Sequence, residues 1–150
     1  MKLCGLQEIG AMASMTDKCI FCDIVAGKLP AYKLYEDELF VAILDRFPVN
    51  PGHTLIIPKF HAEDIFGLCE KEALQIMPLA QKLVGRIKEV LNPNGFNILQ
   101  NNGKAAGQVV FHYHMHIIPR FAGDGVKINP MSHGDVSEKE LEEVAAKIKF

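Results

Sequence analysis

Histidines and apolar residues alternate through residues 111–119, and this segment restricts the possible folds more than any other part of the chain. It reads Phe-His-Tyr-His-Met-His-Ile-Ile-Pro. Successive side chains of a β-strand point to opposite faces of its sheet. A last strand over Val109–Pro119 would therefore present His112, His114 and His116 on one face. The side chains that would fill the core from the other face are Tyr113, Met115 and Ile117.

Three imidazoles on one strand face favour chemistry over surface decoration, because histidine changes its charge near pH 7. Two kinds of site remain open. The three could hold a catalytic zinc ion, or one could be a nucleophile while its neighbours handle phosphate charge and the leaving group. The loop over residues 101–108, Asn-Asn-Gly-Lys-Ala-Ala-Gly-Gln, favours the second. Its amides and free backbone N–H groups suit the oxygens of a phosphoryl group.

The remaining pattern predicts one α+β domain with an antiparallel sheet. Apolar residues recur at helical spacing from Lys71 to Leu91, which predicts one long amphipathic helix kinked at Pro78. Ser137 and Glu140 fit a capping box at the start of a short terminal helix over 137–149. The other predicted elements are a short helix at 19–26 and strands at 32–36, 39–44, 53–58 and 96–100.

Composition narrows the class of protein. The net charge of −2 argues against a general nucleic-acid binder, and no apolar run is long enough to span a membrane. Residues 1–17 contain no signal-peptide pattern, so we expect a cytoplasmic protein, and we interpret them as an extension outside the fold. Residues 18–150 form the predicted domain.

Three stretches resemble the histidine triad (HIT) family, in particular its bacterial Hint-like branch. Residues 107–118 look like the family's His-φ-His-φ-His-φ-φ signature, where φ is apolar, with Gly107-Gln108 ahead of it. Leu44-Asp45 followed by residues 51–59, Pro-Gly-His-Thr-Leu-Ile-Ile-Pro-Lys, resembles a second family stretch. Residues 19–27 resemble the start of Hint-like members. The resemblance covers about residues 18–120, and it implies a five-stranded antiparallel sheet with one long helix.

The resemblance also implies residue roles. His114 would be the nucleophile and would carry the nucleotidyl group as a phosphohistidine. His116 would contact the phosphate and leaving group, His53 would support both histidines, and Asp45 would bind the ribose hydroxyls. The implied nucleotide-binding residues are Asp45, Asn101, Gly107, Gln108, Val109, His114 and His116. Val109 departs from the pattern, because many relatives have Ser or Thr there.

Cys19 and Cys22 form a C-x-x-C pair with three possible interpretations. A thioredoxin-like redox pair would follow a strand, and the preceding residues predict none. Small buried hydrophobes remain possible. A structural zinc site needs two further ligands, and zinc-bearing relatives imply His61 and His112.

These observations together predict a purine-nucleotide hydrolase or transferase that attacks the α-phosphate of nucleoside monophosphate esters, amides or anhydrides. Its alternatives are a non-catalytic nucleotide sensor or scaffold and a three-histidine metallohydrolase. Hint-like relatives pair through the long helix and an edge strand, so we also expect a homodimer.

Overall fold

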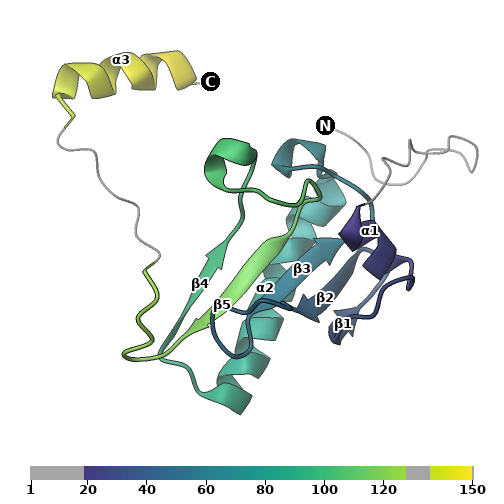
Figure 1. The fold of residues 1–150 in the computed structure, drawn as a ribbon. Coiled ribbons are helices and arrows are strands. Elements are labelled where there is room, and N and C mark those ends of the chain that lie inside the picture. Colours follow the sequence, from purple (N-terminus) through teal and green to yellow (C-terminus); the bar gives the residue numbers. More distant parts are fainter. Residues whose placement is uncertain (1–18, 128–135, 150) are drawn as a thin grey trace, which may run out of the picture.

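The computed structural model describes residues 19–127 and 136–149, so the expected extension at 1–17 lies outside the described residues. One antiparallel sheet of five strands carries the fold, in the order β1-β2-β3-β5-β4 (Figure 1). The strands are β1 (Lys33–Glu36), β2 (Phe40–Leu44), β3 (Thr54–Pro58), β4 (Gly95–Leu99) and β5 (Met115–Arg120). The predicted α+β architecture is confirmed, with β1 and β4 at the sheet edges.

The long helix α2 (Glu70–Leu91) packs on one face of the sheet. Its buried residues recur at helical spacing, as the sequence predicts, because one stripe of the helix faces the sheet. These residues include Ile76, Leu79, Leu83 and Ile87. They pack with Tyr113, Met115 and Ile117 in the larger core cluster. The helix begins with a capping box between Cys69 and Glu72, and Pro78 lies inside it.

The short helix α1 (Ile20–Val25) packs on the opposite face of the sheet (Figure 1). Its Phe21 and Ile24 join a second core cluster formed by apolar residues of β2 and β3. The strand residues of this cluster are Val41, Ile43, Leu55 and Ile57. His116 pairs with Leu55 in the register of β5 against β3, so the His116 side chain lies on the same face as α1.

The predicted strand over Val109–Pro119 is wrong in its first half. β5 begins only at Met115, and residues 109–114 run through bends without a ladder. The backbone N–H of Tyr113 donates instead to the carbonyl of Ala62, in the segment after β3. Consequently only His116 lies in a strand, and the three histidines do not line one regular strand face. The inward positions of Tyr113 and Met115 are nevertheless confirmed.

The loop between β2 and β3 is held close to the end of α2. Gly52 has φ +84°, and a Cβ atom there would lie 2.6 Å from Cδ1 of Leu91 and 3.3 Å from Cγ of Pro119. Both the positive φ and the close approach require glycine. This contact fixes the end of the loop that leads directly into His53.

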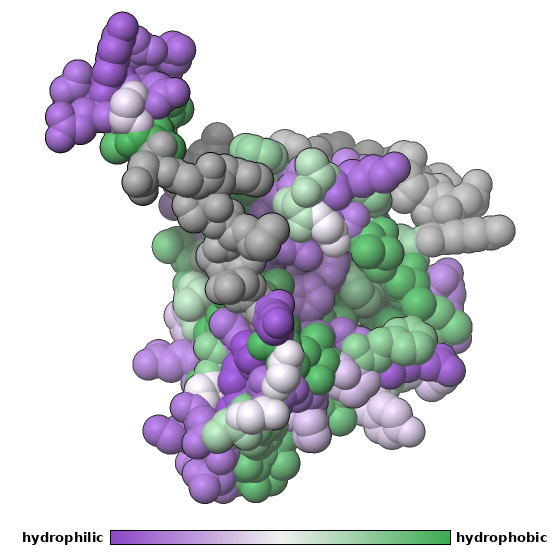
Figure 2. Space-filling model, turned by 60° about the vertical axis from the view of Figure 1, so that its left-hand side comes forward, coloured by the Kyte–Doolittle hydropathy of each residue, from purple (hydrophilic) through white to green (hydrophobic). Residues whose placement is uncertain are grey.

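The predicted terminal helix is confirmed as α3 (Glu138–Ile148), with a capping box between Ser137 and Glu140. Figure 1 shows α3 standing away from the sheet, and Figure 2 shows it as mainly hydrophilic with apolar residues along one side. Leu141, Val144 and Ile148 are all exposed. No helix in the described part of the chain is long and apolar enough to cross a membrane.

Candidate active site

Three histidines from two parts of the chain meet on the face of the sheet that α1 covers. His53 precedes β3, His114 precedes β5 and His116 lies within β5. The Nε2 atom of His53 lies 3.0 Å from Nδ1 of His116. The rings of His114 and His116 meet edge to face with centroids 4.8 Å apart. The structure thus brings together all three histidines for which the sequence predicts a catalytic role.

Hydrogen bonds determine which ring nitrogen carries the proton in His53 and His116, the pair called the relay below. The backbone N–H of Val49 donates to Nδ1 of His53 over 3.1 Å, so this nitrogen is an acceptor. In neutral His53 the proton is then on Nε2, which donates to Nδ1 of His116. Neutral His116 must therefore carry its own proton on Nε2. The carboxylate of Asp45 lies 3.6 Å from Nδ1 of His53, where it would pair with the ring only if His53 were protonated.

His114 is oriented in the opposite sense. Its Nδ1–H donates to the backbone carbonyl of His112 over 2.7 Å, which leaves the lone pair of Nε2 free. The ring of Phe21 packs edge-on against His114 with centroids 5.0 Å apart and limits its rotation. The neutral Nε2 of an imidazole held in this way is a competent nucleophile toward phosphorus.

Burial keeps these imidazoles neutral. The pKa of His116 is lowered to about 4, first by burial and then by the neighbouring His114 and His53. Burial also lowers the pKa of His53 and of His114, against an opposing effect from Asp45. All three side chains therefore keep the uncharged form near pH 7.

The residues of the 101–109 loop mostly shape the loop itself. The buried Gln108 side chain accepts from the N–H of Gly103 over 2.7 Å, and its NH₂ group donates to the carbonyls of Glu63 and Val110. The amide of Asn101 donates to the carbonyl of Gly107. These bonds join the loop to the segment after β3.

Asp45 and Val109 are two further residues for which the sequence predicts nucleotide contacts. Asp45 Oδ1 accepts from the N–H of Phe47 over 2.8 Å, which fixes the carboxylate at the end of β2. The Val109 side chain is 86% exposed. Val109 therefore presents an apolar surface where many relatives would present a hydroxyl, and its predicted nucleotide contact would come from the backbone.

The four predicted zinc ligands converge at a second cluster on the other side of Phe21. Sγ of Cys19 lies 3.4 Å from Nδ1 of His112, and Sγ of Cys22 lies 3.3 Å from Nδ1 of His61. All four ligand atoms lie within 4.8 Å of one another. Bond lengths of tetrahedral zinc would place sulfur and nitrogen ligands ~3.6 Å apart. The donor set and its spacing therefore fit a four-coordinate structural zinc.

The surroundings of this cluster also fit a metal. Nε2–H of His112 donates to the carbonyl of Pro58 over 2.9 Å, which turns Nδ1 toward the cysteines. Burial raises the pKa of Cys22 to about 11, and Cys19 adds to the rise. A cation would offset the charge of two adjacent thiolates. Both nitrogens of His112 are thus directed away from His114 and His116, which contradicts the three-histidine catalytic zinc.

Sequence reasoning missed two groups that orient these histidines. Phe21 separates the two clusters, with its ring 5.8 Å from that of His112 and 5.0 Å from that of His114. Its place inside the C-x-x-C motif is the only sequence signal. The Val49 N–H, which sets the His53 tautomer, has none, because any residue there except proline supplies a backbone N–H.

The sequence matches the HIT domain family over residues 26–123. The chain belongs to the HIT family. Adenosine 5'-monophosphoramidase hnt1 of Schizosaccharomyces pombe is 41% identical over 137 residues, which are 87% of this chain and 98% of that protein. Adenylylsulfatase HINT3 of Arabidopsis thaliana is 40% identical over 108 residues, 72% of this chain and 55% of that protein. The names of these HIT relatives support nucleotide-hydrolase activity in general.

Solved structures of HIT proteins have the same fold. A HIT family protein from Bacillus anthracis is 44% identical, with a TM-score of 0.81 over 88% of this chain and 95% of that chain. A histidine triad family protein from Mycobacterium smegmatis is 36% identical, with a TM-score of 0.70 over 86% and 96% of the two chains. The second structure is described as zinc-bound.

Proposed function

We propose that this HIT protein cleaves purine nucleoside monophosphate esters, amides or anhydrides at the α-phosphate through a phosphohistidine on His114. The observation that carries the proposal is the opposite orientation of two neighbouring imidazoles. His114 keeps a free Nε2 lone pair, because its Nδ1–H is bonded to a backbone carbonyl. His116 keeps an Nε2–H, because its Nδ1 accepts from His53. A nucleophile and a hydrogen-bond donor therefore stand side by side.

Chemistry would follow in two steps. Nε2 of His114 forms a bond to phosphorus while the bond to the leaving group breaks, and the electron pair of that bond leaves with the departing group. The Nε2–H of His116 donates to the leaving atom or a phosphoryl oxygen, and solvent supplies the proton that completes the free leaving group. Water then attacks phosphorus, the electron pair of the phosphorus–nitrogen bond returns to Nε2 of His114, and the proton lost by the water passes to solvent.

The groups around the histidines suit a nucleotide. Asp45, held at the end of β2, would accept from the ribose hydroxyls. Backbone N–H groups of the loop shaped by Asn101, Gly107 and Gln108 would offset charge on the phosphoryl oxygens, including that of Val109. The relatives named as a monophosphoramidase and an adenylylsulfatase support adenylyl substrates.

A structural zinc on Cys19, Cys22, His61 and His112 belongs to the proposal. When bound, this ion would join α1 to the segment after β3, which carries His61, and to the segment before β5, which carries His112, and would stabilise the fold. All four coordination positions would be filled by protein atoms. The chain's own histidines would therefore perform the reaction without a metal-bound water.

We also infer a homodimer through α2 and β4. β4 is an edge strand, and beside it lies a hollow of about 450 Å³ lined by Met77, Pro78, Gln81, Val84 and Ile98. Met77 and Ile98 are half exposed apolar residues on this surface. An unpaired edge beside apolar side chains is a suitable surface for a second copy. Sedimentation at micromolar concentration should give twice the 16.7 kDa chain mass, and Ile98→Lys should shift it toward one chain.

Trapping the intermediate tests the proposed chemistry. Rapid quenching with an adenylyl substrate labelled at phosphorus should leave acid-labile label on a peptide that contains His114. Turnover should be screened with a phosphoramidate, a dinucleoside polyphosphate and a nucleotide sugar. Nucleotide binding without turnover of any of the three would contradict an enzyme and indicate a nucleotide sensor. Turnover with no label on His114 would contradict the covalent mechanism.

A further inference from the structure

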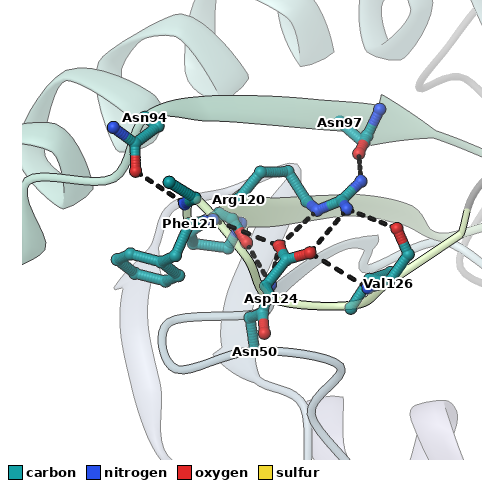
Figure 3. A network of polar contacts seen from close by, with 9 residues as sticks. Asn50, Asn94, Asn97, Arg120, Phe121, Asp124 and Val126 are labelled. Carbon is teal, nitrogen blue, oxygen red and sulfur yellow. Dashed lines mark hydrogen bonds and ion pairs between the residues drawn. The ribbon is translucent and has the colours of Figure 1, made fainter.

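A partly buried carboxylate, that of Asp124, connects the end of β5 to the loop that carries His53. Asp124 Oδ2 and Oδ1 accept from Nε and Nη2 of Arg120 over 2.7 and 2.8 Å, and also from the backbone N–H groups of Phe121 and Val126 (Figure 3). Arg120 donates further to Oδ1 of Asn97 on β4 over 2.6 Å. These bonds hold the carboxylate of Asp124 in one orientation. Its pKa lies far below its ordinary value, mainly because of Arg120.

Asn50 brings the β2–β3 loop to this carboxylate. Its Nδ2 group donates to Oδ2 of Asp124 over 2.8 Å and to the carbonyl of Pro119 over 2.9 Å. Both partners can only accept, because Asp124 is ionised and Pro119 offers a carbonyl oxygen. The amide orientation of Asn50 is therefore determined by chemistry. No other uncharged side chain of this length offers two donors.

The backbone around Asn50 reaches His53 directly. The carbonyl of Asn50 accepts from the N–H of His53 over 3.0 Å. The residue before it, Val49, donates the N–H that bonds to Nδ1 of His53. Movement of Asn50 would therefore change the one bond that places the proton of His53 on Nε2.

We propose that Asn50 is a positioning residue for the relay, which holds the Val49 N–H on His53 and thereby keeps the His53 proton directed at His116. Asp124, aligned by Arg120, anchors it. The inference rests on the proposed function, because the orientation of His116 matters only if His116 assists a reaction at His114. It adds a polar network at the far end of β5 to the catalytic machinery.

Replacing Asn50 should lower kcat and leave nucleotide binding nearly unchanged. Asp45 is held by bonds that do not involve Asn50, since its carboxylate accepts from Phe47 N–H and its N–H donates to the carbonyl of His53. Loss of one hydrogen bond on His53 should shift the ratio of its two tautomers by about tenfold toward Nδ1–H and loosen the ring, so kcat should fall severalfold. KM should stay within about threefold, because binding of the ribose and phosphate is retained.

The variants are Asn50→Ala, which removes both donors, and Asn50→Asp, which places a carboxylate against two acceptors. Asn50→Ser keeps one donor and should give an intermediate kcat, and it remains informative if either of the others fails to fold. Asn94→Ala is the matched control. Asn94 Oδ1 accepts from Ala122 N–H over 2.8 Å in the same region, without contact to the β2–β3 loop (Figure 3). It should retain kcat within about twofold, since an exposed hydrogen bond contributes little.

Kinetics and nitrogen NMR of the imidazoles, both on the full chain, provide the readouts. In the native protein the Nδ1 resonance of His53 should have the shift of an unprotonated nitrogen, and in Asn50→Ala it should move toward a mixture of tautomers. A purely structural role would lower the melting temperature and leave this resonance unchanged, which would overturn the inference. Equal kinetics of Asn50→Ala and Asn94→Ala would overturn it too. If His114→Ala remains active, the proposed function fails instead, so the two failures are distinguishable.

Discussion

His112 and His114 are two residues apart, and each donates one ring N–H to a backbone carbonyl, yet the consequences are opposite. His112 donates from Nε2 to Pro58, which turns Nδ1 toward two cysteines. His114 donates from Nδ1 to His112, which leaves Nε2 beside His116. In the proposed function, the same residue type would therefore serve as a metal ligand or as a nucleophile according to which ring nitrogen is bonded to the backbone. Phe21 lies against both rings.

The largest expected effect is on turnover when His114 is replaced. His114→Ala should lower kcat by about four orders of magnitude or more, because a nucleophile of a covalent mechanism has no substitute. Nucleotide affinity and zinc content should remain near those of the native protein. Steady-state kinetics, calorimetric titration with a nucleoside monophosphate and metal analysis provide the measurements. Near-native turnover would refute the nucleophile assignment.

Replacing His116 should have a smaller effect on the same reaction. His116→Ala removes a hydrogen-bond donor that forms no bond to phosphorus, so kcat should fall by about 100-fold. The phosphohistidine on His114 should still form, more slowly, in rapid-quench experiments. A loss equal to that of His114→Ala would mean that the two histidines act as one inseparable unit.

Removing the sulfur ligands should affect stability more than chemistry. Cys19→Ser with Cys22→Ser should abolish zinc binding and lower the melting temperature by roughly 10 °C or more, since structural zinc contributes directly to folding. The kcat of the folded fraction should change by less than about tenfold, because the carbonyl that orients His114 belongs to the backbone of residue 112. Thermal unfolding and metal analysis test this, and full zinc content in the double variant would contradict the proposed ligands.

The smallest expected effect is that of pH on the relay. The folded-state pKa of His116 is about 4, below the ordinary value near 6.5, because of burial first and of His114 and His53 second. His116 therefore stays neutral between pH 8 and 5, so its own protonation should change kcat by less than about twofold in this range for a substrate that does not titrate there.

Stability should respond to the same pH change in a definite direction. Below pH 6.5 the unfolded chain gains a proton at His116 that the folded protein does not accept until about pH 4. The contribution of neutral His116 to the free energy of unfolding is therefore fully present above pH 6.5 and is lost as the pH falls toward 4. Melting curves across this range check the sign. A kcat that drops with an apparent pKa near 6.5 would show that the relay is not held neutral.

Much of the fold could be predicted because local patterns agree with it. The spacing of Ile76, Leu79, Leu83 and Ile87 predicted α2, and Ser137 with Glu140 predicted the start of α3. The strand over residues 109–119 was predicted too long. Polar and apolar residues can also alternate in a bent segment, and residues 109–114 form such a segment between the zinc-ligand cluster and the catalytic histidines. His112 and Tyr113 alternate in direction, but the Tyr113 N–H donates to the carbonyl of Ala62 and the His112 carbonyl accepts from Nδ1 of His114.

The sequence by itself determined which residue types are available for the proposed chemistry. His-x-His-x-His, the C-x-x-C pair and Asp45 ahead of His53 are patterns of residue type, and side-chain chemistry restricts what such groups can do. Only the tertiary structure decided which histidines join the cysteines and which join the proposed catalytic cluster. The carbonyls of Pro58 and His112, the Val49 N–H and the bond from Asn50 to Asp124 select the proton positions and partners of the histidines. Backbone groups are the same at nearly every position, so their contribution becomes visible only once the chain is folded.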